Sequence, residues 1–384
     1  MARRSPSRYA AYLQVVGKIE CMRDPSWAAA LAGLAVLRLV DAWAERAGQL
    51  PPRTGTELEN DADPIGAAEQ AVRLIEPTLP LRRRLDDLVR SITSAEHRET
   101  TNVLAQALGY ADVVRRDDTW SLAADAYRTV IRNAREPREV ALIPRAAYRL
   151  GACLRMQGHL DDALAEYAHG RVAARRSGDT EGELRLKIAE AHVFMHRAQY
   201  EEADAILLEM LGDTERYGLP RLRARALHDR GVVAFQRGEA TRAIALLAQA
   251  VHESEDPAAR ERAVADLAVT MIAIGQHRVA RQALHAIHTR ASDQALRAMA
   301  AIHLLEIASL DGDRRAFESY RRELASTRLS EPHAATYSVI VGKGYRRFGD
   351  QPLAHDFAHA VPGSEPVVES AVLALVAYAD SQQA

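Results

Sequence analysis

The segment RLGACLRMQGHLDDALAEYAHG, residues 149–170, holds the pattern that decides the fold. Apolar residues recur at three- and four-residue spacing on both sides of Gly158, which indicates two helices joined by a tight turn. Gly151 in the first helix and Ala163 in the second are small enough to let the helices cross closely, and Tyr167 is placed to lock the pair. The segment therefore predicts a helical hairpin.

The alanine at the helix crossing recurs with a period of about 40 residues in the first repeats and about 37 residues in the later ones. Its positions are Ala123, Ala163, Ala203, Ala243, Ala280, Ala316 and Ala354. Twelve residues earlier lies a mostly small residue: Ala111, Gly151, Ala191, Gly231, Ala268, Leu304 and Gly342. Four residues later lies a mostly larger one: Tyr127, Tyr167, Leu207, Leu247, Leu284, Tyr320 and Ala358. Such a period indicates a solenoid, in which each repeat packs only on its neighbours.

This pattern resembles the tetratricopeptide (TPR) family over about residues 100–362. The resemblance implies an all-α, right-handed superhelical solenoid of about seven TPR-type pairs over 101–362, each with a helix A followed by a helix B. The repeats exceed the family's usual length of about 34 residues, and the aromatic residue expected early in helix A is absent. The expected turn positions are Gly158, Gly238, Gly275 and Gly349, with Asp118, Ala198 and Asp311 in the other repeats.

Residues 1–100 are expected to form a helical N-terminal module with helices at 8–22, 26–47, 64–76 and 80–95 and a linker at 49–63. This layout is similar to that of the Rap-type bacterial regulators, and the repeat length is similar to that of MalT-like regulators. The resemblance implies a peptide-responsive signalling or transcriptional regulator. No motif of the module transfers those families' functional residues to this chain.

Residues 363–384 are expected to form a C-terminal capping helix. Its stretch 366–380, PVVESAVLALVAYAD, is apolar on several sides, although the outer face of a cap should be polar. The helix is therefore expected either to tuck into the last groove or to form a homodimer contact.

Composition excludes several classes of function. The formal charge of -2 argues against direct nucleic-acid binding, and the arginine-rich composition, with only three lysines, is typical of a GC-rich genome. Two cysteines and a start without a signal peptide predict a cytoplasmic protein, in keeping with a bacterial regulator. No apolar run approaches the roughly 20 residues that span a bilayer, so we expect no membrane segment.

Catalytic signatures are missing as well, so we predict no enzyme and no cofactor. Two histidine pairs, His192 with His196 and His355 with His359, have helical i, i+4 spacing. A metal site needs at least a third ligand, and none can be named, so no metal is expected. An enzyme that uses a histidine–carboxylate pair in the groove is a third alternative.

Arginine recurs six residues before the small position in four consecutive repeats. In TPR arrays helix A lines the concave groove, and these arginines would share that face with other polar and aromatic residues. The predicted partner-binding residues are Arg145, Tyr148, Arg155, Arg185, His192, Arg225, His228 and Arg262. They favour a scaffold or regulator that binds a protein or peptide with an acidic segment. The alternative is a Rap-like or MalT-like regulator whose N-terminal module is repositioned by its ligand.

Overall fold

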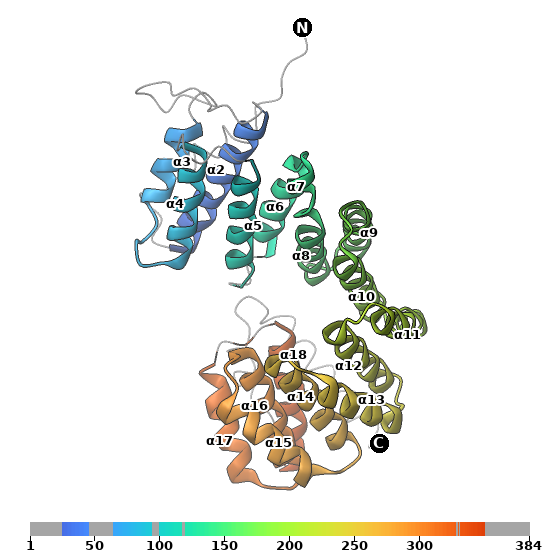
Figure 1. Ribbon diagram of the computed structural model, residues 1–384. Helices are drawn as coiled ribbons and strands as arrows, with labels where there is room; N and C mark the ends of the chain where they lie inside the picture. Colours follow the sequence, from blue (N-terminus) through green and yellow to red (C-terminus); the bar gives the residue numbers. More distant parts are fainter. Residues whose placement is uncertain are drawn as a thin grey trace. The chain divides into compact units, whose positions relative to one another are not determined.

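The computed structural model describes residues 25–45, 64–93, 100–116, 120–327, 329 and 331–349. The predicted helix at 8–22, the linker at 49–63 and the C-terminal helix at 363–384 lie outside these residues. The regular elements of the described part of the chain are all helices (Figure 1). None of them is both long and apolar enough to cross a lipid bilayer.

The chain divides into two compact units, 1–199 and 200–384. The described helices of the first unit are α2 (Pro25–Glu45), α3 (Pro64–Arg73), α4 (Pro80–Thr93), α5 (Thr100–Arg116), α6 (Trp120–Asn133), α7 (Pro137–Val140), α8 (Ile143–Met156), α9 (Leu160–Ser177) and α10 (Thr180–His196). Those of the second unit are α11 (Tyr200–Arg216), α12 (Pro220–Gln236), α13 (Ala240–Glu253), α14 (Pro257–Ala273), α15 (His277–Arg290), α16 (Gln294–Leu310), α17 (Arg314–Ala325) and α18 (Glu331–Arg347).

The first unit has one apolar core that runs from Ala32 to Val193. Within it α2 packs on α3, α4, α5 and α6, while α8 packs on α6, α9 and α10. The helices α2, α3 and α4 lie close to the ranges expected for the N-terminal module. These helices share one apolar core with the first repeats, so the pattern of buried residues shows no domain boundary near residue 100. The predicted domain division therefore stays a prediction.

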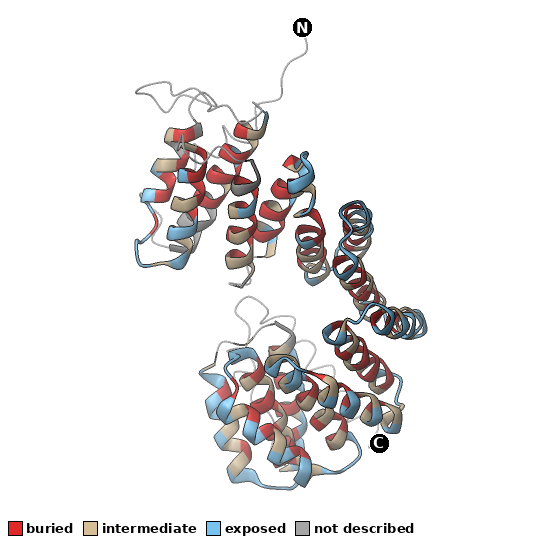
Figure 2. Cartoon of the chain, viewed as in Figure 1, coloured by how far each residue is buried: buried red, intermediate tan, exposed pale blue. Residues whose placement is uncertain are grey.

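In the second unit each helix from α11 to α16 packs on the next, and α16 also packs on α17. Alternate helices meet as well, because α14 contacts both α12 and α16, and α16 contacts α18. The buried side chains lie along the faces that neighbouring helices share (Figure 2). The predicted all-α solenoid of TPR-type helix pairs is thus confirmed, with α5, α8, α10, α12, α14, α16 and α18 as the A helices.

The small residues predicted at the crossings of helix A with helix B lie at those crossings in the first repeats. The crossing alanines that are fully buried are Ala123, Ala163, Ala203, Ala243 and Ala280. A Cβ added to Gly151 would lie 2.2 Å from Cε1 of Tyr167, and one added to Gly231 would lie 2.6 Å from Cγ of Leu247. Glycine is therefore required at both places by close approach of helix B.

The last repeats depart from the predicted pattern. The glycine of α18 that lies against a neighbouring side chain is Gly344, whose added Cβ would be 2.3 Å from Cε2 of Phe317. The predicted small position, Gly342, has no atom within 4 Å of an added Cβ. Its expected partner, Ala354, lies outside the described residues.

Most of the predicted turn positions carry the left-handed backbone that favours glycine. Gly158 and Gly238 have φ of 80° and 77°, and Ala198 adopts φ of 55° at the equivalent place. The prediction for Asp311 was wrong by one residue, because it keeps φ of -87° at the end of α16. The turn is made instead by Gly312, with φ of 73°.

Replacing Gly151 with alanine is expected to destabilise the fold. The added methyl would overlap the buried ring of Tyr167, and overpacking of this kind costs about 1–3 kcal/mol in the free energy of unfolding. Gly212 in α11 is the matched control, since it is exposed and an added Cβ has no neighbour within 4 Å. Gly212→Ala should stabilise by about 1 kcal/mol through helix propensity alone.

Urea unfolding followed by circular dichroism measures both effects. A Gly151→Ala protein as stable as the Gly212→Ala protein would contradict the close crossing of α8 with α9.

Candidate functional site

Side chains of neighbouring A helices meet on one face in the first unit, which we call the helix-A face. Asp112 of α5 accepts a 2.6 Å hydrogen bond from the hydroxyl of Tyr127 and one from Arg145 of α8, and Nε of Arg149 lies 3.9 Å from its Oδ1. Burial alone would raise the pKa of Asp112, but the hydrogen bonds from Tyr127 and Arg145 outweigh it and lower the pKa. Asp112 is therefore a carboxylate at neutral pH, held between α5 and α8.

The same face continues from α8 to α10. A guanidinium nitrogen of Arg155 contacts Nε2 of His196, and burial followed by the charge of Arg155 lowers the pKa of His196. His192 is half-buried one turn earlier on α10, and Tyr148 of α8 lies under the guanidinium of Arg149, 5.4 Å from its ring centroid. Arginine, tyrosine and histidine side chains thus occur together along this part of the face.

Arg185 of α10 pairs with Glu181 one turn earlier on the same helix. The side chains of Arg185 and Glu181 are 43% and 49% exposed, so the pair lies at the surface. An ion pair of this kind contributes roughly 0.3–0.5 kcal/mol.

In the second unit, His228 of α12 lies between two carboxylates. Its Nε2 is 2.7 Å from Asp266 of α14, and its Nδ1 is 3.2 Å from Asp229, whose side chain is 5% exposed. Arg225 donates from Nε to both oxygens of Asp229, at 2.8 and 3.1 Å. Burial alone would lower the pKa of His228, but the hydrogen bonds with Asp229 and Asp266 outweigh it and raise the pKa to about 9.

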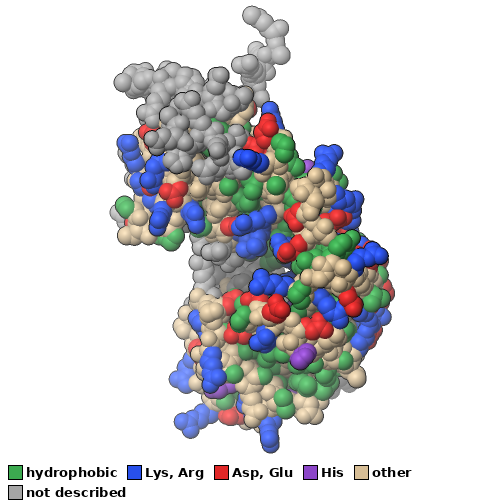
Figure 3. Space-filling view, in the orientation of Figure 1, with side chains coloured by type: hydrophobic (Ala, Val, Ile, Leu, Met, Phe, Trp, Pro, Cys, Tyr) green, Lys and Arg blue, Asp and Glu red, His purple; other side chains and the backbone are tan. Residues whose placement is uncertain are grey.

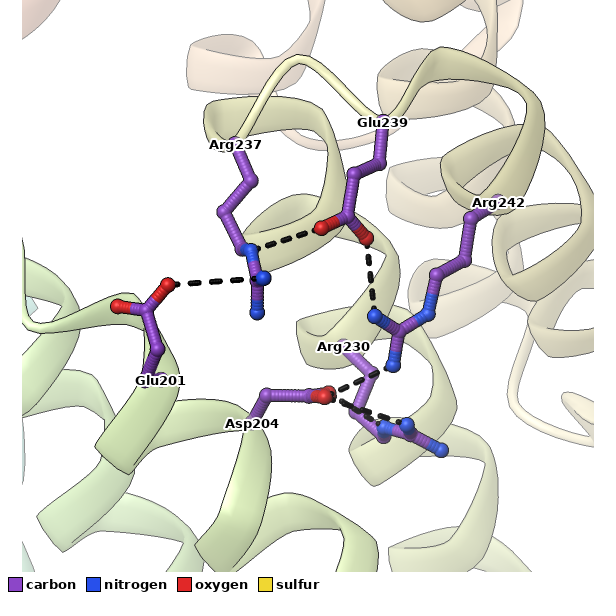
Figure 4. A network of polar contacts seen from close by, with 6 residues as sticks. All are labelled: Glu201, Asp204, Arg230, Arg237, Glu239 and Arg242. Atoms are coloured by element: carbon purple, nitrogen blue, oxygen red, sulfur yellow. Dashed lines mark hydrogen bonds and ion pairs between the residues drawn. The ribbon is translucent and has the colours of Figure 1, made fainter.

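A second charged network joins α11, α12 and α13 (Figure 4). Asp204 of α11 binds Arg230 and Arg242, and Glu239 bridges Arg242 and Arg237 at 2.9 and 2.8 Å. Arg237 also approaches Glu201 of α11 at 3.5 Å. Basic and acidic side chains are similarly interspersed over the face of the molecule in view in Figure 3. Many arginines of this chain therefore act as internal counter-ions.

The four arginines predicted to bind an acidic partner have different surroundings. Arg145 and Arg225 hold the poorly exposed carboxylates of Asp112 and Asp229. Arg185 has an exposed partner, and Arg262 is an exposed residue of α14 with no ion pair to another described residue. Arg145 and Arg185 belong to the first unit, and the other two belong to the second.

Sequence reasoning missed two arginines of the helix-A face, Arg115 and Arg149. A signal for Arg115 was available, because it precedes Arg155 by one repeat length. Arg149 gave no such signal, since its contact with Asp112 depends on how α8 packs beside α5.

The described part of the chain offers no metal site. No three histidine, cysteine, aspartate or glutamate side chains within it come together in a group that could hold a metal ion. Cys153 is buried, and burial raises the pKa of its thiol to about 11. His355 and His359, the second predicted histidine pair, lie outside the described residues, as does Cys21.

Comparison with protein-family models and with curated proteins gives no match. Among solved structures, the chain is similar to the Rap conjugation gene regulator of the plasmid pLS20 in complex with a Phr peptide. The sequence identity is 12% and the TM-score is 0.56, and the match covers 90% of this chain and 97% of that chain. The chain has the fold of the Rap proteins.

Two further Rap structures support this. A Rap protein complexed with competence and sporulation factor is 12% identical with a TM-score of 0.51, over 91% of this chain and 99% of that chain. The apo form of RapI is 12% identical with a TM-score of 0.51, over 89% and 98%. The predicted Rap-like layout is thus confirmed at the level of the fold.

Proposed function

We propose that this chain is a non-enzymatic cytoplasmic regulator that binds a peptide or protein segment along its helix-A face. The observation that carries the proposal is the likeness to Rap structures over about nine-tenths of the chain. One of these is a complex with a Phr peptide, and another is a complex with competence and sporulation factor. The chemistry of the helix-A face supports it. Tyr148, His192 and several arginines are of the types that anchor protein interfaces, where aromatic residues and arginine are enriched.

An acidic segment is the partner that we propose. At Arg185 an incoming carboxylate would replace Glu181 in an exposed pair of low energy, and at Arg262 it would displace no carboxylate of a described residue. If a ligand carboxylate bound Arg145 or Arg225 instead, a poorly exposed aspartate would lose its counter-ion, and this loss would cost free energy. These two arginines therefore position other groups. Of the four predicted arginines, Arg185 is the recognition residue on the helix-A face in this proposal, since Arg262 belongs to the second unit.

A second proposal, ligand-driven repositioning of the N-terminal helices, is favoured by one contact. Asp41 of α2 accepts hydrogen bonds of 2.6 and 2.7 Å from Arg132 and of 2.8 Å from Asn133, both at the end of α6. A ligand that moved α5 and α6 would therefore carry α2 with them. This coupling would make the chain a peptide-responsive switch of the Rap-like kind.

The proposal predicts a specific loss of binding. Dodecapeptides selected from a random phage-displayed library on the full chain should be enriched in Asp and Glu. Their affinity, measured by fluorescence anisotropy, should fall about threefold in Arg185→Ala, since one exposed charge contact supplies about 0.7 kcal/mol.

Arg176→Ala is the matched control, because Arg176 is an exposed arginine on a B helix of the same unit. It should leave the affinity unchanged. Failure to enrich any peptide, or an equal loss in the two variants, would refute the proposal.

A further inference from the structure

The helix-A face of the first unit carries more guanidinium groups than carboxylates. The A helices α5 and α10 carry few acidic residues, and α8 carries none. Asp112 lies on α5, and Glu181, Glu183 and Glu190 lie on α10. Glu183 and Glu190 pair with Arg175 and Arg171 of α9. Asp112 forms ion pairs with Arg145 and Arg149, and Glu181 forms one with Arg185. Arg115 and Arg155 are left with no carboxylate partner in the described part of the chain.

Three of these guanidinium groups also have an unused donor. The Nε atoms of Arg115, Arg149 and Arg155 are buried and make no hydrogen bond. Arg115 lies one helical turn after Asp112, so both point to the face on which Arg149 approaches Asp112. The group that Arg155 contacts on α10 is the neutral ring of His196, whose pKa is lowered by burial and by Arg155 itself. Among the described residues, Arg115 and Arg155 thus hold positive charge in half-buried positions without a carboxylate partner.

We infer that Arg115, Arg149 and Arg155 bind the carboxylate groups of an acidic peptide segment that lies across α5 and α8. The inference rests on the proposed function and names the ligand chemistry of the helix-A face. A planar guanidinium binds a carboxylate through two parallel N–H donors, and partial burial strengthens that bond relative to bulk water. The phenol of Tyr148, which stacks with Arg149, borders the cluster.

The repeat position of the two arginines favours a ligand with recurring charges. Arg115 and Arg155 occupy the same position of successive A helices, one repeat length apart in the sequence. The ion pair of Asp112 with Arg145 bridges these helices, and an extended peptide gains about 3.3 Å in length per residue, so a short segment can reach both. The favoured ligand is therefore an extended peptide in which acidic side chains recur.

Charge balance distinguishes the two units. In the second unit Arg225, Asp229, His228 and Asp266 compensate one another across α12 and α14. Among the described residues, the arginines whose buried Nε makes no hydrogen bond belong to the first unit, and the acidic segment is assigned to its face.

The test uses a fluorescein-labelled peptide with the sequence Gly-Ser-Asp repeated four times, and its Asn counterpart, on the full chain. The Asp peptide should bind at least tenfold more tightly than the Asn peptide in low-salt buffer. Arg115→Gln/Arg155→Gln should weaken the Asp peptide at least tenfold. Arg176→Gln/Arg278→Gln, which removes the same charge from exposed positions on B helices, should weaken it less than twofold.

Thermal melting separates binding from a structural role. Saturating Asp peptide should raise the melting temperature of the wild type but not that of Arg115→Gln/Arg155→Gln, whose own melting temperature should match the wild type. A lower melting temperature for that variant together with unchanged peptide affinity would overturn the inference. So would equal loss in both double variants, or binding of single-stranded DNA as tight as that of the Asp peptide, which indicates a general polyanion surface.

The inference and the proposed function fail separately. If library-selected peptides bind along the helix-A face while the Asp and Asn peptides bind equally, carboxylate binding by Arg115, Arg149 and Arg155 is refuted and the proposed function stands. If neither kind of peptide binds, both are refuted.

Discussion

Asp204→Ala is expected to lower the free energy of unfolding by about 3 kcal/mol, because it leaves a nearly buried arginine without its carboxylate. Asp204 accepts hydrogen bonds of 2.7 Å from Arg230 and 2.8 Å from Arg242. The side chain of Arg230 is 10% exposed. Burial alone would raise the pKa of Asp204, but the bonds from Arg230 and Arg242 outweigh it and hold the pKa below its ordinary value.

Asp161→Ala is the matched comparison, because Asp161 also pairs with an arginine, Arg197, but its side chain is 94% exposed. Its loss should cost no more than about 0.5 kcal/mol. Urea unfolding at pH 7 measures both variants. Equal losses for Asp161→Ala and Asp204→Ala would mean that burial of the Asp204 network contributes nothing.

The stability of the second unit is expected to fall as the pH rises from about 6.5 to 9. The pKa of His228 is raised from 6.5 to about 9 by Asp229 and Asp266, so the folded state holds a proton that the unfolded state releases. The stabilisation is fully present below pH 6.5 and is lost as the pH passes the folded pKa. The difference corresponds to about 3 kcal/mol for this side chain, which is 17% exposed.

The two histidines with lowered pKa values, His196 and His333, do not interfere in this window. Their effect appears as the pH falls below 6.5, where the unfolded state takes up protons first. Urea unfolding at pH 6.5 and 9 should show the decline in the wild type and in His169→Gln, an exposed control, but not in His228→Gln. A decline of the same size in His228→Gln would contradict the assignment.

The sequence was sufficient to predict the fold because its signals are periodic. Ala123, Ala163 and Ala203 recur at a constant spacing, and each is fully buried at a helix crossing. Turn positions were less certain where two candidate residues adjoin, as at Asp311 and Gly312, because the one that takes positive φ depends on where the helix ends.

The site was harder to predict because ion pairing is decided by contacts between helices. The partners of Arg185 and Arg225 lie four residues away on the same helix and were readable from the sequence. Asp112 lies 33 residues before Arg145, and pairing them requires the offset between α5 and α8. The position of an arginine within its repeat is therefore a poor guide to whether its charge is free.

Photo-crosslinking tests binding along the helix-A face most directly. A photoreactive benzoylphenylalanine would replace Tyr148 of α8 in one protein and Val172, a 44% exposed residue of α9, in another. We predict that a library-selected peptide crosslinks to position 148 and not to position 172, and that unlabelled peptide competes the product away. Crosslinking at position 172 with none at position 148 would contradict the account.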